Sequence, residues 1–339
     1  MNVRFVVVAV LAATLLAACG TTATAPPPDG IGYGAIASAV TLSTLACEPL
    51  AWCVAAGTNP TASSGTASVE VSAGGRGVWA PASTPPLPGT TLDAAGCWAS
   101  GCLLGGAGPA GTVVVIVNPA HKAASTTATH PPGSGIAAIA CTGPGRCLAL
   151  VTSTTSTAVF STADSGAVWT QRSALPAALA VATSASCPNP SDCVAVGTGP
   201  HGASAARSVD GGARWRLAAL PKGLETFTSV TCGSQHWCLA TARRANGTAV
   251  LLRSTDGGVA WSPTVSPLPG VAAVTCVQMP TCVAAGGGSS GGAITSSLRS
   301  PHPKALTLAY VPDAIVAIAC ATPTKCAAIT PASTVSFVA

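Results

Sequence analysis

Charged residues are scarce in this chain of 339 residues. Asp, Glu, Lys and Arg together make up 7% of it, with 15 Lys and Arg against 10 Asp and Glu. A protein that binds nucleic acid needs a basic surface that neutralises several phosphates. The weak positive balance therefore argues against nucleic acid as a partner.

Long apolar runs are absent beyond the N-terminus. Hydrophobic residues make up 48% of the chain, but there they form short Ala and Val segments separated by Gly, Pro, Ser and Thr. A transmembrane helix needs about 20 consecutive apolar residues, so this part should contain none. Short apolar segments bounded by turn-forming residues instead predict many short strands.

The N-terminus has the order of an export signal. Arg4 gives a positive charge, and the apolar run at 5–18 ends directly before Cys19. The residues Leu-Ala-Ala-Cys at 16–19 resemble the bacterial lipoprotein signal, which implies cleavage before Cys19 and attachment of lipid to its thiol. An ordinary secretory signal that happens to contain Cys is the alternative.

This resemblance divides the chain into three parts. We expect a signal peptide at 1–18, a lipid-anchored flexible tether at 19–32 and a folded domain at 33–339. The lipid would hold the protein in the membrane, on the outer side of the bacterial cytoplasmic membrane, as a cell-envelope protein.

Cysteine, by contrast, is abundant and regularly spaced. Without Cys19, the 15 cysteines leave seven close pairs, and the first members of successive pairs lie 44 to 50 residues apart. That period fits one four-stranded blade of a β-propeller. The pairs are Cys47 with Cys53, Cys97 with Cys102, Cys141 with Cys147, Cys187 with Cys193, Cys232 with Cys238, Cys276 with Cys282, and Cys320 with Cys326.

The seven pairs predict an all-β fold, a seven-bladed β-propeller of four-stranded blades. In each repeat one strand should lead into the first Cys and the next strand should leave the second, with a tight loop between them. Cysteines that flank such a loop in an exported protein are expected to form a disulfide. Metal sites are the alternative, but no His recurs at a fixed offset, so we expect neither a metal nor a cofactor.

A second motif follows three of the pairs. It reads Ser or Thr, any residue, Asp, any residue, Gly, two further residues and Trp, and it occupies residues 162–169, 208–215 and 254–261. A degenerate copy lies at 72–79. The motif matches the Asp-box (BNR) repeat of sialidases, sortilin-type receptors and photosystem II assembly factors, so the chain resembles these proteins as a propeller without the features of a sialidase.

The expected role of the motif is structural. The carboxylates of Asp164, Asp210 and Asp256 should accept hydrogen bonds from backbone N–H groups of their own turns, and Gly should supply positive φ angles. The indoles of Trp169, Trp215 and Trp261 should pack between neighbouring sheets.

The last repeat ends one strand short. Residues 33–40 lie before Cys47 where the Trp-led strands of other repeats lie before their next Cys. We therefore expect this segment to pair with the C-terminal strand and close the ring, which would remove exposed sheet edges.

Residues for catalysis are few. The sialidase resemblance implies an Arg cluster, a Tyr nucleophile paired with Glu, and an acid Asp. The chain has only two Tyr, and its three Glu occupy unlike positions in the repeats. The Gly-rich residues 286–288 and 291–292 lack the Lys and Ser or Thr of a phosphate loop and are interpreted as a flexible turn. We assign no catalytic residue and do not expect an enzyme.

The favoured function is a non-catalytic, monomeric envelope module that binds a protein, a glycan or a cell-wall polymer. A glycan-active hydrolase of the Asp-box type with an unrecognised site is the alternative. The Cys loops and Asp boxes should share one face, which leaves the opposite face for binding. Its loops carry His201, Lys222, Glu225, Arg243 and Arg244. These side chains could also be solvated charges without a ligand.

Overall fold

The computed structural model describes residues 31–34, 40–48, 52–59, 65–73, 79–127, 129–266, 268, 270–278, 281–288, 291–296, 305–307, 313–322, 325–331 and 334–337. Cys19 and nearly all of the proposed tether lie outside these residues. No helix in the described ranges is long and apolar enough to cross a membrane. The helices they contain are two single 3-10 turns, η1 (Pro119–His121) and η2 (Ala177–Leu179).

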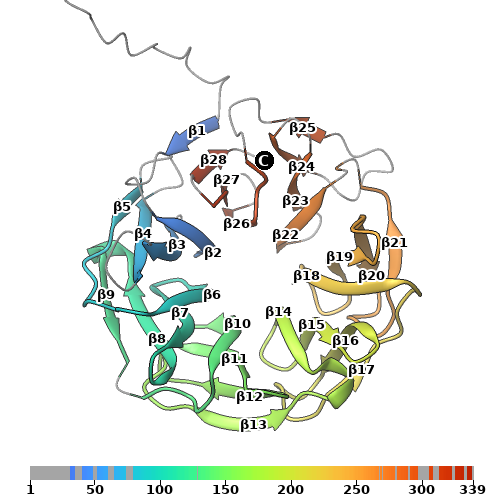
Figure 1. The fold of residues 1–339 in the computed structure, drawn as a ribbon, viewed down its shortest axis with the longest axis horizontal. Coiled ribbons are helices and arrows are strands. Elements are labelled where there is room, and N and C mark those ends of the chain that lie inside the picture. Colours follow the sequence, from blue (N-terminus) through green and yellow to red (C-terminus); the bar gives the residue numbers. More distant parts are fainter. Residues whose placement is uncertain are drawn as a thin grey trace, which may run out of the picture.

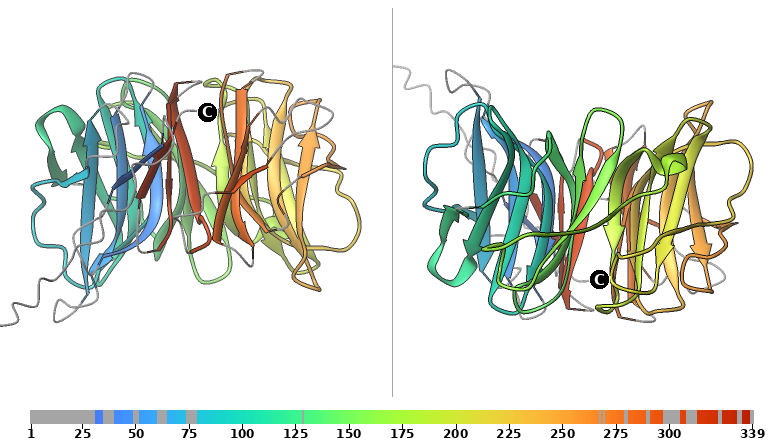
Figure 2. Two further views of the ribbon diagram at one scale, coloured as in Figure 1. Left: turned by 90° about the horizontal axis from the view of Figure 1, so that it is seen from above. Right: turned by 90° about the horizontal axis from the view of Figure 1, so that it is seen from below.

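The described strands form seven antiparallel sheets of four strands each, arranged around a common centre (Figure 1). The view from the side shows that the strands run between the two ends of a short, broad body (Figure 2). The innermost strands are β2 (Thr41–Cys47), β6 (Thr91–Trp98), β10 (Gly135–Gly143), β14 (Val181–Ser186), β18 (Leu224–Cys232), β22 (Val271–Gln278) and β26 (Ala317–Thr322).

The two middle strands of each sheet follow in sequence order. The second strands are β3 (Trp52–Asn59), β7 (Gly101–Gly108), β11 (Arg146–Thr152), β15 (Cys193–Gly199), β19 (Cys238–Arg244), β23 (Thr281–Gly288) and β27 (Lys325–Ile329). The third strands are β4 (Thr66–Ala73), β8 (Gly111–Asn118), β12 (Thr157–Thr162), β16 (Gly202–Ser208), β20 (Ala249–Ser254), β24 (Gly291–Ser296) and β28 (Thr334–Phe337).

The outermost strands are short. They are β5 (Trp79–Pro81), β9 (Ala123–Thr126), β13 (Thr170–Ala174), β17 (Arg216–Leu217), β21 (Ser262–Thr264), β25 (Ala305–Thr307) and β1 (Ile31–Gly34). In three of the sheets the strand begins directly after the Trp of an Asp box, as the sequence predicts.

The last sheet takes its outermost strand from the start of the chain. Its order is β1-β28-β27-β26, and Ile31 lies opposite Phe337. The sequence prediction placed this strand at 33–40, but the pairing uses residues 31–34, and Val40 is not in a strand. The prediction placed the strand too close to the innermost strand that follows it. A loop separates an outermost strand from the next innermost strand, as residues 218–223 separate β17 from β18.

All seven predicted disulfides are present. In each pair the Cα atoms are 3.9 to 4.2 Å apart. The cysteines join the end of an innermost strand to the start of the second strand, and in six sheets they are direct register partners. The pair Cys97 and Cys102, with its shorter loop, follows the same pattern.

The described residues form seven apolar clusters between the sheets, and each cluster contains side chains of two neighbouring sheets. One cluster joins the first sheet to the last, through Leu42 and Ala55 on one side and Ala327 and Ile329 on the other. The second strands are buried along most of their length on both faces, as in β15 and β19. Their Ala and Val side chains suit this position because the sheets converge towards the centre (Figure 1).

A β-bulge interrupts the innermost strand of six sheets at an equivalent position, for example between Leu92 and Ala94. In four of them a Gly on the second strand lies opposite the residue before the bulge. A Cβ there would overlap the carbonyl oxygen of the residue directly before that opposite residue, so only Gly permits this close approach. These glycines are Gly57, Gly106, Gly197 and Gly286.

The interpretation of residues 286–288 and 291–292 as a flexible turn is wrong. Gly286 to Gly288 end β23, and Gly291 and Gly292 begin β24, with Gly287 opposite Gly292. Gly286 is one of the glycines that face a bulge. Its conformational role is therefore close packing of two strands and not flexibility.

Candidate functional site

The three Asp-box turns, residues 162–169, 208–215 and 254–261, are held by their own hydrogen bonds. In the second turn Asp210 Oδ1 accepts from Ser208 Oγ at 2.9 Å and from the Arg214 N–H at 2.8 Å. Asp164 and Asp256 accept equivalent bonds. Gly211 and Gly212 have φ angles of 67° and 84°. Each of these turns is therefore closed by hydrogen bonds to a carboxylate of the turn itself.

These bonds also affect ionisation. The bond from the Val168 N–H holds the pKa of Asp164 below its usual value, and the bond from the Arg214 N–H lowers the pKa of Asp210. The carboxylates therefore stay charged and serve as acceptors within the turns. A catalytic acid needs the opposite shift, towards a raised pKa.

The box tryptophans pack between sheets. Trp261 is buried, lies edge-on to Phe227 with ring centroids 6.3 Å apart, and contacts side chains of the preceding sheet. Trp215 and Trp169 are half-buried and pack against their own and the preceding sheets. In the degenerate copy Trp79 packs against the last sheet, whereas residues 74–78 lie outside the described residues.

The Cys loops and the box turns lie together at one end of the sheets. Cys238 is the register partner of Ser254, the first residue of the third box. The N–H of Gly257 donates to the carbonyl of His236 in the neighbouring Cys loop, and the N–H of Gly211 donates to that of Ser191. This end is therefore braced in each of these sheets by a disulfide and a bonded turn.

The five binding candidates lie at the opposite end. His201 is in the turn between β15 and β16. Lys222 lies just before β18, and Glu225 is the second residue of that strand. Arg243 and Arg244 end β19. Gly202 packs against the backbone of Leu224 and Glu225, and Arg243 is the register partner of Thr226. The fold thus brings three segments together. All five side chains are exposed, and the described residues form no ion pair among them.

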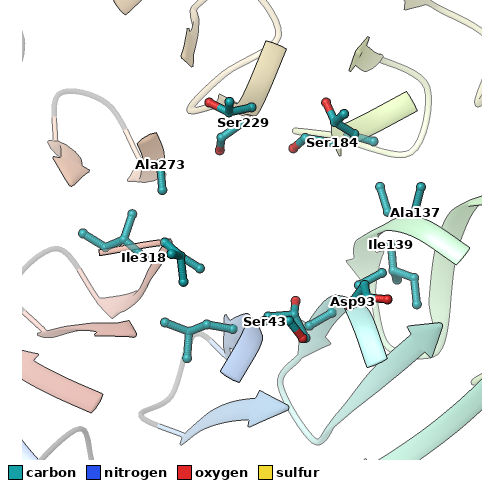
Figure 3. Close-up of a pocket in the computed structure, with 18 residues that line it drawn as sticks. Ser43, Asp93, Ala137, Ile139, Ser184, Ser229, Ala273 and Ile318 are labelled. Carbon is teal, nitrogen blue, oxygen red and sulfur yellow. The ribbon is translucent and has the colours of Figure 1, made fainter. Parts of the chain in front are cut away.

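A hollow of about 230 Å³ lies where the innermost strands meet (Figure 3). Around this hollow, hydroxyl groups of residues at the β-bulges donate hydrogen bonds to the innermost strand of the next sheet. Ser43 Oγ donates to the Leu92 carbonyl at 2.7 Å, and Thr183 Oγ1 donates to the Phe227 carbonyl at 3.0 Å. Asp93 occupies the equivalent bulge position in β6 and is the only charged side chain among the described lining residues.

Sequence reasoning missed Asp93. The signal was available, because alignment of the repeats puts it at the position of Ser43, Thr183 and Thr228. A single carboxylate does not form the acid pair of a glycoside hydrolase, whose two carboxyl groups lie about 5 to 10 Å apart.

Two further carboxyl groups are buried. Glu70 and Glu48 are each 2% exposed, and burial raises the pKa of both. The Oε1 atom of Glu70 accepts from Ser68 Oγ at 3.4 Å. Glu70 alternates along β4 with Val69 and Val71, which face the second sheet, so it faces the last sheet. A raised pKa suits a general acid, but this group lies between sheets, where a glycan would not reach it.

The residues described contain no group of three or more His, Cys, Asp or Glu side chains that could hold a metal ion. Of the five His, His302 lies outside this part of the chain, as does Tyr310.

Comparison with known proteins identifies the fold as a β-propeller. YCF48 from Cyanidioschyzon merolae matches with a TM-score of 0.66 and 13% identity, over 91% of this chain and 99% of that one. A structure titled YCF48 bound to D1 peptide matches with a TM-score of 0.66 and 16% identity, over 93% and 99%. Streptogramin B lyase matches with a TM-score of 0.62 and 10% identity, over 90% and 96%.

No family model matches the sequence, and the search of curated proteins found no match. At these identities the structural neighbours establish the fold alone. They include a lyase and a protein bound to a peptide, so the fold does not select a function.

Proposed function

We propose that this protein is a lipid-anchored, non-catalytic binding module of the bacterial cell envelope. Its seven sheets are then the seven blades of a closed propeller, and its partner is a protein or an envelope polymer. The pairing of β1 with β28 and the apolar cluster between the first and last sheets support a closed ring. The lipoprotein-like residues 16–19 support the anchor.

The main support for a binding function is that the carboxylates and cysteines of the two repeated motifs stabilise the fold. The box carboxylates accept hydrogen bonds inside their own turns, and the paired cysteines are disulfides. The two motifs that recur along the chain therefore build a rigid scaffold. The charged loops at its other end are exposed and lie on ordered hairpins, which is how binding sites are commonly presented.

The hairpin that carries Arg243 and Arg244 is braced internally. The Arg244 N–H donates to the Thr248 carbonyl at 3.0 Å, and the Thr248 N–H donates to Asn246 Oδ1 at 3.0 Å. Two arginines that are neighbours in sequence on a hydrogen-bonded hairpin provide guanidinium groups that suit carboxylate or phosphate groups of a partner. The structure titled YCF48 bound to D1 peptide supports peptide binding as one use of such a fold.

Replacing Arg243 and Arg244 with Ala should lower partner capture several-fold without lowering the melting temperature. Capture is measured by crosslinking in intact cells that display the anchored protein, followed by mass spectrometry. Removing two exposed charges elsewhere, with Arg253→Ala and Lys325→Ala, is the matched control. Asp164→Ala should do the reverse, because it removes the hydrogen bonds that hold a turn at the other end. Capture unchanged by the double Arg variant would refute this surface.

Cys19→Ser should abolish lipidation and release the protein from the membrane. A single thiol is the proposed attachment point, so no second residue can replace it. Cells labelled with a fatty acid are extracted with a phase-separating detergent, and the protein is followed into the detergent or the aqueous phase. Cys97→Ser is a control, since it changes a cysteine of the folded domain. Fatty acid on the Cys19→Ser protein would show that the lipoprotein interpretation is wrong.

A further inference from the structure

Three arginines and three aliphatic side chains share one hollow at the end of the Asp-box turns. The hollow has a volume of about 360 Å³ and is lined by Arg207, Arg214, Arg216, Val209, Leu217 and Val259, together with Asp210. All but Val259 belong to the sheet β14–β17, and Val259 comes from the next box turn. Such a concentration of positive charge stands out in a chain with 7% charged residues.

Two of these arginines face one another across the sheet. Arg207 on β16 is the register partner of Arg216 on β17. Like charges directly opposite one another on antiparallel strands are destabilising. The equivalent pairs in the other two sheets with a complete box are Ser161 with Thr170 and Arg253 with Ser262, so neither repeats this repulsion.

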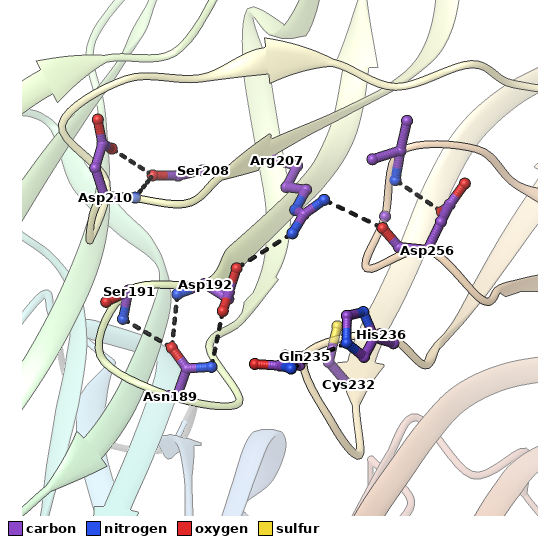
Figure 4. A network of polar contacts seen from close by, with 12 residues as sticks. Asn189, Ser191, Asp192, Arg207, Ser208, Asp210, Cys232, Gln235, His236 and Asp256 are labelled. Carbon is purple, nitrogen blue, oxygen red and sulfur yellow. Dashed lines mark hydrogen bonds and ion pairs between the residues drawn. The ribbon is translucent and has the colours of Figure 1, made fainter.

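Arg207 is fixed in place by its neighbours (Figure 4). Its Nη2 atom forms an ion pair with Asp192 Oδ1 at 3.2 Å, and its Nη1 donates to the Asp256 carbonyl at 3.2 Å. The Nε–H of Arg207 is buried and has no acceptor among the described residues. Because the guanidinium is held before any ligand arrives, little of its side-chain entropy remains to be lost on binding.

The other two arginines are exposed. Among the described lining residues Asp210 is the only carboxylate, and it attracts Arg214, but one carboxylate cannot balance both exposed arginines. The Arg214 and Arg216 side chains form no ion pair within the described residues. The hollow therefore keeps excess positive charge that a ligand could neutralise.

The aliphatic side chains are unusually open. Val209 is 60% exposed, Leu217 51% and Val259 49%. A cluster of exposed aliphatic groups beside cations is typical of a surface that buries an amphipathic partner. Arginine pairs well with carboxylates, and the aliphatic groups would contact apolar side chains on the same partner.

We propose that this hollow binds an extended peptide segment of another protein in which carboxylate side chains alternate with aliphatic ones. A phosphate-rich polymer would use the arginines but would leave the three aliphatic side chains without a partner, so the peptide is favoured. The site rests on the proposed binding function, but not on Arg243 and Arg244, which lie at the other end of the sheets.

The test is binding of a short fluorescent peptide in which Glu alternates with Val, measured by anisotropy with the full-length protein in detergent. Arg214→Gln with Arg216→Gln should weaken binding about tenfold or more, since it removes the charge-assisted hydrogen bonds to the peptide carboxylates. Leu217→Asn should weaken it as well. Arg253→Gln with Lys325→Gln changes two exposed cations that do not line the hollow, so it is the matched control and should leave the affinity unchanged.

Melting temperature separates binding from folding. Arg216→Gln removes a like-charge contact, so the variant should melt at the same temperature as the parent protein or above it. A peptide with Gln in place of Glu should not bind, and inorganic tripolyphosphate should not compete at equal concentration.

Two results would overturn the site: no binding of the Glu peptide, or binding that survives the Arg214 and Arg216 changes. Tripolyphosphate binding that depends on these arginines, in the absence of peptide binding, would indicate a site for phosphate. Loss of capture in Arg243 and Arg244 variants with no peptide binding would leave the proposed function standing and refute only this hollow.

Discussion

Reduction of all seven disulfides is expected to unfold the protein. Each bond closes a hairpin loop of only a few residues and contributes about 2 kcal/mol. The seven together contribute on the order of 10 to 15 kcal/mol, which is as large as the whole unfolding free energy of a typical domain. The reduced chain should therefore lose its ordered sheets, and circular dichroism and Trp fluorescence would both report the change.

The burial of the disulfides determines how fast a reductant can reach them. The second cysteine of each pair is buried, and Cys102, Cys238 and Cys282 are fully so. A reductant should act slowly in buffer and quickly once mild denaturant opens the sheets. Replacing a single pair, Cys232 and Cys238, with Ala should lower the melting temperature by roughly 4 °C. A fully reduced protein that keeps its melting temperature would contradict a stabilising role for these bonds.

The sequence located most of the sheets because their markers recur. Two cysteines separated by only four or five residues can form a disulfide only if the chain turns back between them, so each Cys pair marked where an innermost strand ends and a second strand begins. The box Trp marked the start of an outermost strand in the same way. For β1 no Cys or Trp marks the boundary, and the prediction was displaced by two residues at its start and by more at its end.

The candidate sites depend on register, which the sequence reveals poorly. Arg207 and Arg216 lie on either side of a box turn, and their direct opposition follows only from how β16 pairs with β17. A one-residue shift in pairing would have sent one side chain to the other face. The role of the glycines that face the bulges also depends on register. In the sequence Gly286 belongs to a Gly-rich segment typical of a loop, and only its pairing with Val271 shows that it lies in a strand.

Deletion of residues 31–39 is expected to destabilise the whole domain, whereas deletion of residues 20–28, a segment of equal length in the proposed tether, should have no effect on stability. Without β1, the last sheet keeps three strands and β28 becomes an unpaired edge. Loss of the backbone bonds over four residue pairs, at about 1 kcal/mol for each bond, should lower the unfolding free energy by on the order of 3 kcal/mol. Thermal unfolding compares the two truncated proteins, and light scattering reports aggregation through the new edge.

Two proline variants separate this pairing from a general effect of shortening the chain. Backbone N–H groups of an antiparallel edge strand point alternately towards the partner strand and away from it. Of the neighbours Gly32 and Tyr33, only one can therefore donate to β28. Proline at that residue should lower the melting temperature, and proline at the other should change it little, because proline is tolerated where an edge N–H faces outwards. Equal melting temperatures for both variants and both deletions would show that β1 does not hold the ends of the chain together.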